Sequence, residues 1–487
     1  MSKVPPLDLS FMLLEAPNRP MHMTAYQVFR LPARQKKTYI PRLLEAYRSG
    51  PVAKPFNQKL KWLDGGVASW QTVEPDLRYH VRHLAVPPPG TMQQLSELVS
   101  FLNAPLLDRA RPLWECYIIE GLENDQFAIM IRVHHGMIDG MGAMKLFDQC
   151  IVRSPTDKAM KSFWMPQEKA AKSRPRSGRS QAQSLLARLS KLPADLLHIG
   201  AGVAELGAQN LRLKQSTASL PFAATKTLFN NMATSSERRY GSCDIPLDRA
   251  KALSKATGTS VNDVVMALID HALHGYLKEH KAATKEPLVA LMAMSIRQEG
   301  QAASGNQVSA ELVPMGKPAA NISTRLEQIH SSIDQIKGRS AKLPAAVRQL
   351  YAMLLFGSTT LPDVAAAFKS LPSINLVISN MRGPEDQRYL AGAPMVAFTG
   401  CPIVPPGAGL NVSFVTVNDM ICLAAGAAPE AVEDPSRLTD LIMAALVELE
   451  AAVSSTKAGG KKPVRKKAGS KQAAGRKAAA ITRRQTN

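Results

Sequence analysis

The side chains best suited to chemistry are two adjacent histidines and an aspartate in the string HHGMIDG at residues 134–140. An imidazole has an unperturbed pKa of about 6.5, so it can accept a proton from an alcohol near neutral pH. Neighbouring residues at the end of a strand point to opposite sides. We therefore expect only one of His134 and His135 to face a given cavity, while the other packs behind it. Asp139 could orient the loop, either by capping a following helix or by pairing with an arginine.

The elements on either side of this string should hold it in place. The apolar residues 127–133 predict a buried strand, and apolar residues recur at helical spacing after the string. Gly136 and Gly140 would permit the tight turn between strand and helix. A purely structural histidine pair, with Asp139 as a helix N-cap, is the alternative interpretation. No third ligand lies nearby at a zinc-binding spacing, so no metal is predicted.

The composition is that of a globular protein, with 45% hydrophobic and 20% charged residues among 487. A chain of this length exceeds one compact core, so two domains and a linker are expected. The sequence has no run of about 18 apolar residues and no apolar N-terminal core, so neither a transmembrane helix nor a signal peptide is predicted. The five cysteines are scattered without CxxC spacing, which is typical of free thiols in a reducing compartment. We therefore predict a cytoplasmic protein.

The formal net charge of +21 is concentrated at one end of the chain. Residues 457–487 contain eleven Lys or Arg and no Asp or Glu, which is about half of the net charge. This composition predicts a disordered tail over residues 456–487. The tail could be a solvated appendage, could attract the protein to the anionic surface of the inner membrane or of lipid droplets, or could contact nucleic acid non-specifically.

The composition also divides the rest of the chain. Residues 1–153 and residues 221–455 mix strand and helix signals, and we expect each to form a domain. Residues 154–220 between them include a basic, low-complexity stretch and predict a crossover linker.

Local patterns also predict elements in the second domain. Ser260 and Asp263 have the spacing of a capping box and predict a helix over residues 264–277. The further elements expected are buried strands at residues 288–296 and 374–379 and a last helix at residues 435–453.

The string HHGMIDG matches the HHxxxDG motif of acyltransferases related to chloramphenicol acetyltransferase and to peptide-synthetase condensation domains. The wider sequence resembles specifically the bacterial wax ester synthase/diacylglycerol acyltransferase family. The other segments that carry this resemblance are Glu15 and residues 20–23 (PMHM), 80–83 (HVRH), 89–90 (PG), 111–115 (RPLWE), 261–264 (VNDV), 295–297 (SIR), 379–384 (SNMRGP) and 409–411 (GLN). Together they span the chain apart from the linker and the tail.

The resemblance implies a mixed α/β fold of two chloramphenicol-acetyltransferase-like domains with a substrate tunnel at their interface. It implies an enzyme of storage-lipid synthesis that moves a long-chain acyl group from acyl-CoA to a fatty alcohol or a diacylglycerol, without a cofactor. In this family the second histidine of the motif is the general base, which here is His135. His134, Asp139 and Gly140 complete the motif, and Asp139 is interpreted as an orienting residue.

Asn262 and Asp263 match a pair that matters for activity in the family. Both fall in the first turn of the predicted helix, where the helix dipole favours an acid. We therefore interpret them as structural support of the active site rather than as direct participants. The remaining candidates are Pro112, Leu113 and Trp114, interpreted as packing residues, and Arg297, a candidate partner of Asp139 by analogy with related acyltransferases.

Two segments depart from the family pattern and put the substrate preference in doubt. This chain has NMRGP at residues 380–384 where members commonly have Asn-Val-Pro-Gly-Pro. Residues 409–411 are Gly-Leu-Asn, but the Ser-Tyr that usually follows is missing. Two other functions remain open. One is a condensation-type HHxxxDG acyltransferase with a carrier-bound donor, although no carrier domain adjoins. The other is a non-catalytic lipid-droplet or nucleic-acid-associated protein, which the intact motif disfavours.

Overall fold

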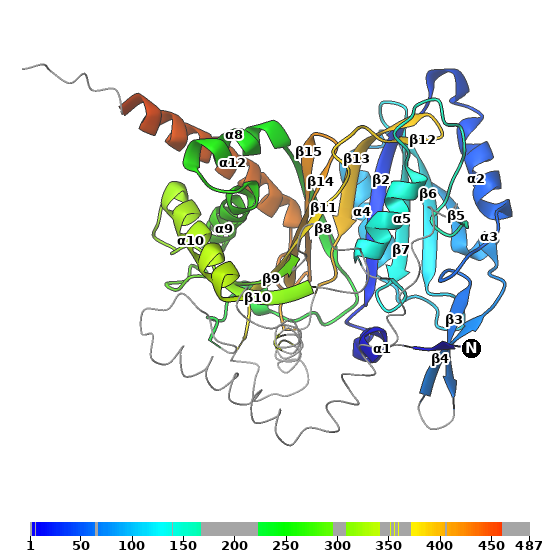
Figure 1. Ribbon diagram of the computed structural model, residues 1–487, viewed down its shortest axis with the longest axis horizontal. Coiled ribbons are helices and arrows are strands. Elements are labelled where there is room, and N and C mark those ends of the chain that lie inside the picture. The colour runs from blue at the N-terminus through cyan, green and yellow to red at the C-terminus, as the bar shows by residue number, and fades with distance from the viewer. Residues whose placement is uncertain are drawn as a thin grey trace, which may run out of the picture.

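The computed structural model describes residues 2–459 apart from residues 5, 64–66, 139, 167–222, 296–307, 405–406 and, except for 351, 355 and 359, residues 341–371. The described chain forms two halves that lie side by side, each built on a six-stranded mixed sheet (Figure 1). This arrangement confirms the predicted mixed α/β class with two related halves.

The sheet of the first half has the strand order β12-β13-β2-β7-β6-β5. Its strands are β2 (His22–Arg30), β5 (Val81–Ala85), β6 (Trp114–Leu122), β7 (Gln126–His134), β12 (Tyr389–Leu390) and β13 (Ala393–Cys401). The helices of this half are α1 (Pro6–Leu14), η1 (Ala33–Gln35), α2 (Tyr39–Ser49), α3 (Leu77–His80), α4 (Met92–Asn103) and α5 (Gly140–Cys150). Helices α2 and α5 cover one face of the sheet, and α4 covers the other.

Strand β7 shows why the predicted strand forms. Its odd-numbered apolar residues, from Phe127 to Val133, pack under α2 and α5, whereas Ala128 and Met130 pack under α4. Successive side chains of a strand point to opposite faces, so a run that is apolar throughout is buried on both sides. The prediction of a buried strand at residues 127–133 is confirmed. Arg132 and His134 continue the side that faces α4.

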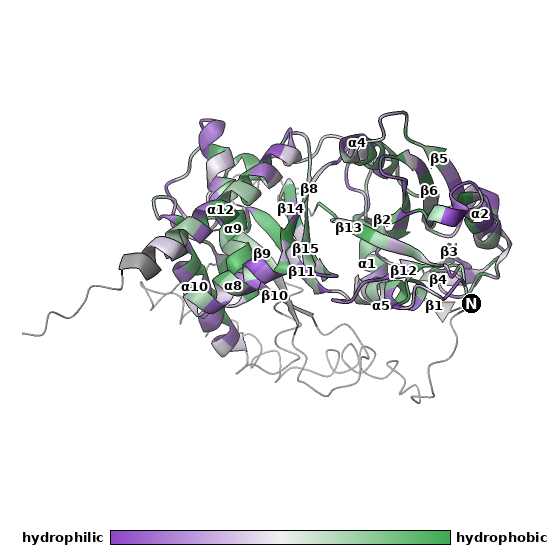
Figure 2. Ribbon diagram, turned by 90° about the horizontal axis from the view of Figure 1, so that it is seen from above, coloured by the Kyte–Doolittle hydropathy of each residue, from purple (hydrophilic) through white to green (hydrophobic). Residues whose placement is uncertain are grey.

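The sheet of the second half has the strand order β10-β9-β11-β14-β15-β8. Its strands are β8 (Arg239–Pro246), β9 (Val289–Ser295), β10 (Val308–Pro314), β11 (Leu376–Arg382), β14 (Leu410–Val417) and β15 (Met420–Ala427). Its helices are η2 (Leu228–Asn230), α8 (Leu247–Thr257), α9 (Val261–Glu279), α10 (Ile322–Ser340) and α12 (Pro435–Gly459). These four α-helices contribute apolar residues to one core with the second sheet. Figure 2 shows them gathered beside that sheet.

A small third sheet of β1 (Ser2–Lys3), β4 (Val67–Thr72) and β3 (Gln58–Leu63) projects beside α1. Across the portion of the chain that the structure describes, no helix combines the length and the apolar character needed to cross a bilayer.

One strand from the C-terminal part of the chain belongs to the sheet of the first half. Strand β13 follows β11 of the second half in sequence, yet it pairs antiparallel with β2 of the first half, with Cys401 opposite Thr24. Residues 154–166, which the sequence assigned to the linker, also pack on the first half, where the buried Trp164 stacks on Trp114 at a ring-centroid distance of 4.8 Å. The two sheets therefore do not correspond to two continuous segments of the chain, because β13 lies within residues 221–455 and joins the first sheet. The rest of the predicted linker lies outside the described residues.

The predicted elements of the second half are present, with shifted ends. The predicted helix at 264–277 is α9, and the strand at 288–296 is β9. Strand β11 begins at Leu376, two residues later than predicted, and directly before it the side chain of Asn375 accepts from the backbone N–H of Val289 at 2.8 Å.

The predicted end of the last helix at residue 453 is wrong, since α12 continues to Gly459. No Gly or Pro lies between residue 453 and Gly459 to end the helix sooner. The first residues of the predicted tail are therefore helical, and residues 460–487 lie outside the described residues.

Candidate active site

The string HHGMIDG leaves the sheet at the end of β7 and enters α5. Its backbone is tied to both neighbouring segments, because His134 N–H donates to the carbonyl of Leu113 and His135 N–H donates to that of Met21, each at 2.9 Å. A Cβ atom at Gly136 would lie 2.7 Å from the carbonyl oxygen of Asp8, so this position has room only for glycine.

His134 is fully buried behind the turn. The backbone N–H of Gly136 donates to its Nδ1 at 3.0 Å, so the ring proton is on Nε2. That Nε2 lies 3.4 Å from Oε1 of Glu15, whose Oε2 accepts from Arg109 at 2.9 Å. Burial alone would raise the pKa of Glu15, but its contacts with His134 and Arg109 lower the pKa to about 2. Glu15 is therefore an anion that fixes the tautomer and orientation of His134.

His135 is less buried than His134. Its ring is only partly buried and stacks on Phe11 of α1, with centroids 4.0 Å apart and planes inclined by 23°. The two imidazoles therefore differ in burial, and His134 is the one that packs behind the turn. That His135 faces a substrate cavity stays a prediction.

Asp139 and Arg297 lie outside the described residues. Their pairing stays a prediction. Gly140 begins α5, and a Cβ atom built on it would lie 3.3 Å from Sδ of Met381 on β11. The motif therefore contacts the second half of the molecule.

The first turn of α9 also contacts β11, the strand that carries Met381. The Nδ2 group of Asn380, the neighbour of Met381 on β11, donates to Oδ1 of Asn262 at 2.9 Å. Asp263 is 1% exposed and closes the capping box with Ser260, so the box predicted from the sequence is confirmed. Asn262 and Asp263 thus differ: the first is joined to β11 through Asn380, and the second anchors the helix.

Pro112, Leu113 and Trp114 pack as the sequence suggested. All three are buried. The Trp114 ring stacks on His80 at 4.4 Å, and its Nε1 donates to the carbonyl of Phe56 at 2.8 Å. Leu113 acts on the motif through its backbone carbonyl, which accepts from His134.

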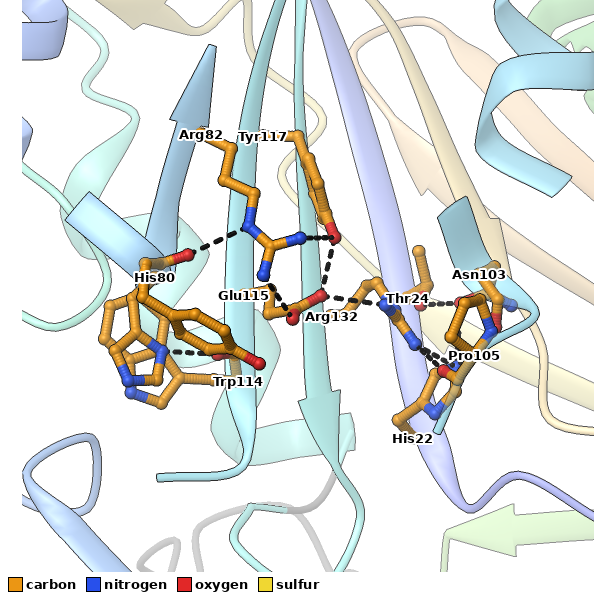
Figure 3. Close-up of polar contacts among 11 residues, drawn as sticks. His22, Thr24, His80, Arg82, Asn103, Pro105, Trp114, Glu115, Tyr117 and Arg132 are labelled. Atoms are coloured by element: carbon orange, nitrogen blue, oxygen red, sulfur yellow. Dashed lines mark hydrogen bonds and ion pairs between the residues drawn. The ribbon is translucent and has the colours of Figure 1, made fainter. Parts of the chain in front are cut away.

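A buried ion-pair network lies on the α4 side of the sheet, and the sequence analysis did not predict it (Figure 3). Glu115 accepts from Arg132 at 2.8 Å, from Tyr117 at 2.6 Å and from Arg82 at 3.1 Å. An arginine at position 132 inside an apolar strand is the signal that could have revealed the network, because a buried guanidinium requires a partner.

The network extends to the end of α4 and into the second half. Nε2 of His22 lies 3.3 Å from Arg132 Nη2 and 3.0 Å from Oδ1 of Asn103. Asn103 in turn donates to the hydroxyl of Tyr240 on β8. The polar contacts behind the motif therefore bridge the two sheets.

The burial of His22 predicts a pH-dependent stability. Burial and the neighbouring guanidinium of Arg132 lower the pKa of His22 to about 3, against about 6.5 in an unfolded chain. Between these values the unfolded state binds more protons, so this contribution is complete above about pH 6.5 and is lost as the pH falls toward 3. We expect His22→Gln, which keeps an N–H donor, to flatten the fall in the thermal midpoint between about pH 7 and pH 5. Thermal unfolding of both proteins across this range measures the slopes, and equal slopes would contradict the prediction.

No cluster of three or more His, Cys, Asp or Glu side chains that could hold a metal ion occurs in the described parts of the chain. Proton transfer is the step that a partly buried imidazole such as that of His135 suits.

Comparison with known families matches both halves of the chain. The wax ester synthase/diacylglycerol acyltransferase catalytic domain matches residues 4–265, and the WS/DGAT C-terminal domain matches residues 304–450. The chain is 52% identical over 466 residues to Tgs4 of Mycobacterium tuberculosis, described as a probable diacylglycerol O-acyltransferase; the match covers 94% of this chain and 98% of Tgs4. It is 31% identical over 424 residues to the O-acyltransferase WSD of Acinetobacter baylyi, covering 85% and 90% of the two chains.

Solved structures show the same fold. The wax ester synthase/diacylglycerol acyltransferase from Marinobacter aquaeolei VT8 superposes with a TM-score of 0.74 at 25% identity, over 93% of this chain and 100% of that one. The first condensation domain of the calcium-dependent antibiotic synthetase superposes with a TM-score of 0.57 at 13% identity, over 93% and 96% of the two chains. The prediction of two chloramphenicol-acetyltransferase-like halves is confirmed.

Proposed function

The chain belongs to the wax ester synthase/diacylglycerol acyltransferase family and is an O-acyltransferase, and from this premise we propose that His135 is its general base. The proposed reaction moves a long-chain acyl group from acyl-CoA to the hydroxyl of a diacylglycerol or a long-chain alcohol. The observation that carries the assignment of the base is the contrast between the two imidazoles. His134 is buried with its tautomer fixed, whereas His135 remains accessible.

The proposed step is direct transfer. His135 takes the proton of the acceptor hydroxyl as the hydroxyl oxygen attacks the thioester carbonyl carbon. The tetrahedral oxyanion then collapses, the carbon–sulfur bond breaks, and the thiolate of coenzyme A takes the proton back from the imidazolium. General base catalysis of this kind contributes about 10²–10⁴-fold. Positioning of the two substrates and hydrogen-bond donors toward the oxyanion would add to it.

We place the meeting point of the substrates between the two halves, in the predicted tunnel. The contact of Gly140 with Met381 joins the two halves and supports this location. The pair of Asn262 and Asn380 lies within the second half, next to Met381 along β11. The Asn380 side of the pair is exposed, so its amide is available to a ligand. Asp139 is proposed to orient the loop, with Arg297 as its partner.

The reaction is tested by thiol release from palmitoyl-CoA, with hexadecanol, a diacylglycerol or no acceptor. Release that requires an acceptor and yields the matching ester would support the proposal and would rank the two acceptors. Release without any acceptor would indicate thioester hydrolysis instead. If folded protein released no thiol with either acceptor, a carrier-bound donor of the condensation type would become the better candidate.

We also propose that the basic segment at residues 460–487 attracts the enzyme to anionic lipid. About 1 kcal/mol per basic residue is available near such a surface, and the acceptors proposed above are lipids. Truncation after Gly459, where α12 ends, should abolish co-sedimentation with vesicles that contain phosphatidylserine at low salt. The full chain and the truncated protein should both bind weakly to neutral vesicles. Unchanged sedimentation after truncation would contradict the proposal, and tail-dependent binding to DNA alone would favour the nucleic-acid alternative.

A further inference from the structure

Asp263 carries a buried carboxylate in the first turn of α9, and two donors hold one of its oxygens. Oδ2 accepts from the backbone N–H of Ser260 at 2.9 Å and lies 2.8 Å from Nδ1 of His330 on α10. A carboxylate that is ionised only accepts hydrogen bonds, so Nδ1 of His330 carries the proton in this contact. The tautomer of His330 is therefore defined by Asp263.

This contact matters because Asp263 has few other partners. Its side chain is 2% exposed, and Oδ1 has no hydrogen-bond partner among the residues that the structure describes. A buried charge that loses a donor is strongly disfavoured. Without the His330 ring, the carboxylate would keep only the Ser260 N–H and the partial positive charge of the helix N-terminus.

His330 reaches Asp263 from a second helix. Its side chain is 35% exposed, and its Nε2 lies 3.4 Å from Oδ2 of Asp334, one turn further along α10. Ile329 and Ile333 of α10 pack in the same core as α9. The ring therefore lies where it connects the surface of α10 with the first turn of α9.

The first turn of α9 leads to the candidate active site. Asn262 precedes Asp263, and its Oδ1 accepts from Asn380 at 2.9 Å. The next residue on β11, Met381, lies against Gly140 of the motif. Asn380 and Met381 point to opposite faces of β11 because they are neighbours on the strand. A rotation of this turn would therefore reach the motif through a shift of β11 itself.

We propose that His330 is a positioning residue for acyl transfer. It holds the Asp263 carboxylate, which fixes the N-terminal turn of α9 and thereby, through the Asn262–Asn380 hydrogen bond, strand β11, whose Met381 contacts the motif. This inference rests on the proposed function. A merely structural surface histidine, paired with Asp334 alone, would have no specific effect on turnover.

Three substitutions of His330 and one of Asp334 separate the two contacts of the ring. His330→Ala should lower kcat by about 10-fold, because displacement of an active-site group by a fraction of an ångström can cost up to about 100-fold. His330→Asn places an amide N–H near the position of Nδ1 and should recover most of kcat. His330→Gln places it near the position of Nε2, toward Asp334, and should not. Asp334→Asn is the matched control and should retain wild-type kcat.

A double-substitution cycle tests the route of the effect. If His330 acts through the amide pair, His330→Ala should cause little further loss of kcat in an Asn380→Ala enzyme, since coupled residues are not additive. Independent losses that multiply would overturn the proposal, as would full activity of His330→Ala. Equal activities of the Asn and Gln variants would also overturn it, and this comparison stands even if His330→Ala does not fold. Absence of turnover by the wild-type enzyme would instead overturn the proposed function.

Discussion

Replacement of His135 by alanine is expected to lower kcat for acyl transfer by about 10²–10⁴-fold, which is the contribution of a positioned general base. KM for palmitoyl-CoA should change little, because the imidazole acts on the acceptor proton in the transition state and not in ground-state binding of the donor. The ring is only partly buried, so the variant should fold. Acceptor-dependent thiol release and the thermal midpoint measure the two quantities.

His134→Ala is the matched control for that experiment. His134 is fully buried and lies beside the Glu15 anion, so its loss should lower the thermal midpoint as well as activity. The expected contrast is an inactive, stable His135 variant and a destabilised His134 variant. A folded His135→Ala enzyme with full activity would contradict the assignment, as would a stable His134 variant with an equal loss of kcat.

The second large effect concerns stability and the buried pair of Arg132 and Glu115. Their side chains are 2% and 7% exposed, and Nη1 of Arg132 donates to Oε2 of Glu115 at 2.8 Å (Figure 3). Breaking such a pair by removing one partner costs about 3–5 kcal/mol, because the other charge stays buried. We expect Arg132→Met to destabilise the protein by about 3 kcal/mol, the lower end of the range, since Glu115 keeps Arg82 and Tyr117 as donors.

Urea-induced unfolding measures this loss, and two further variants interpret it. Arg132→Met combined with Glu115→Leu should recover part of the stability, because no buried charge is then left without its partner. Arg82 also loses Glu115, but its side chain is 38% exposed and can be solvated. Lys36→Met removes an exposed pair with Asp125, whose side chains are 47% and 52% exposed, and should cost less than about 1 kcal/mol. A single Arg132 variant as stable as the Lys36 variant would show that the buried pair contributes little.

The sequence could predict those parts of the site that depend on neighbours along the chain. An apolar run followed by HHGMIDG predicts a strand, a turn and a helix, and β7, the turn at Gly136 and α5 are found there. The capping box at Ser260 and Asp263 could likewise be predicted, because a cap joins residues three positions apart. The strand alternation of 134 and 135 even separates the buried imidazole from the accessible one.

Contacts between distant segments could not be predicted in this way. The Asn262–Asn380 hydrogen bond joins residues 118 positions apart, and the His330–Asp263 contact joins residues 67 apart. A histidine on the outer side of an amphipathic helix has the same local pattern whether it faces water or a buried carboxylate. Only the packing of α10 on α9 decides between them.

The sequence by itself therefore determined the reaction class and the fold class through its resemblance to an acyltransferase family, and it determined the strand, turn and helix of the motif because their patterns are local. The role of His135 as base is an expectation from the same resemblance. The tertiary structure decided which of the remaining polar residues meet. It paired β13 with β2 across the two halves, buried Arg132 against Glu115 and brought Asn262 to Asn380. The physical reason is that hydrogen bonds and ion pairs require atoms within a few ångströms, and topology alone sets which distant residues meet.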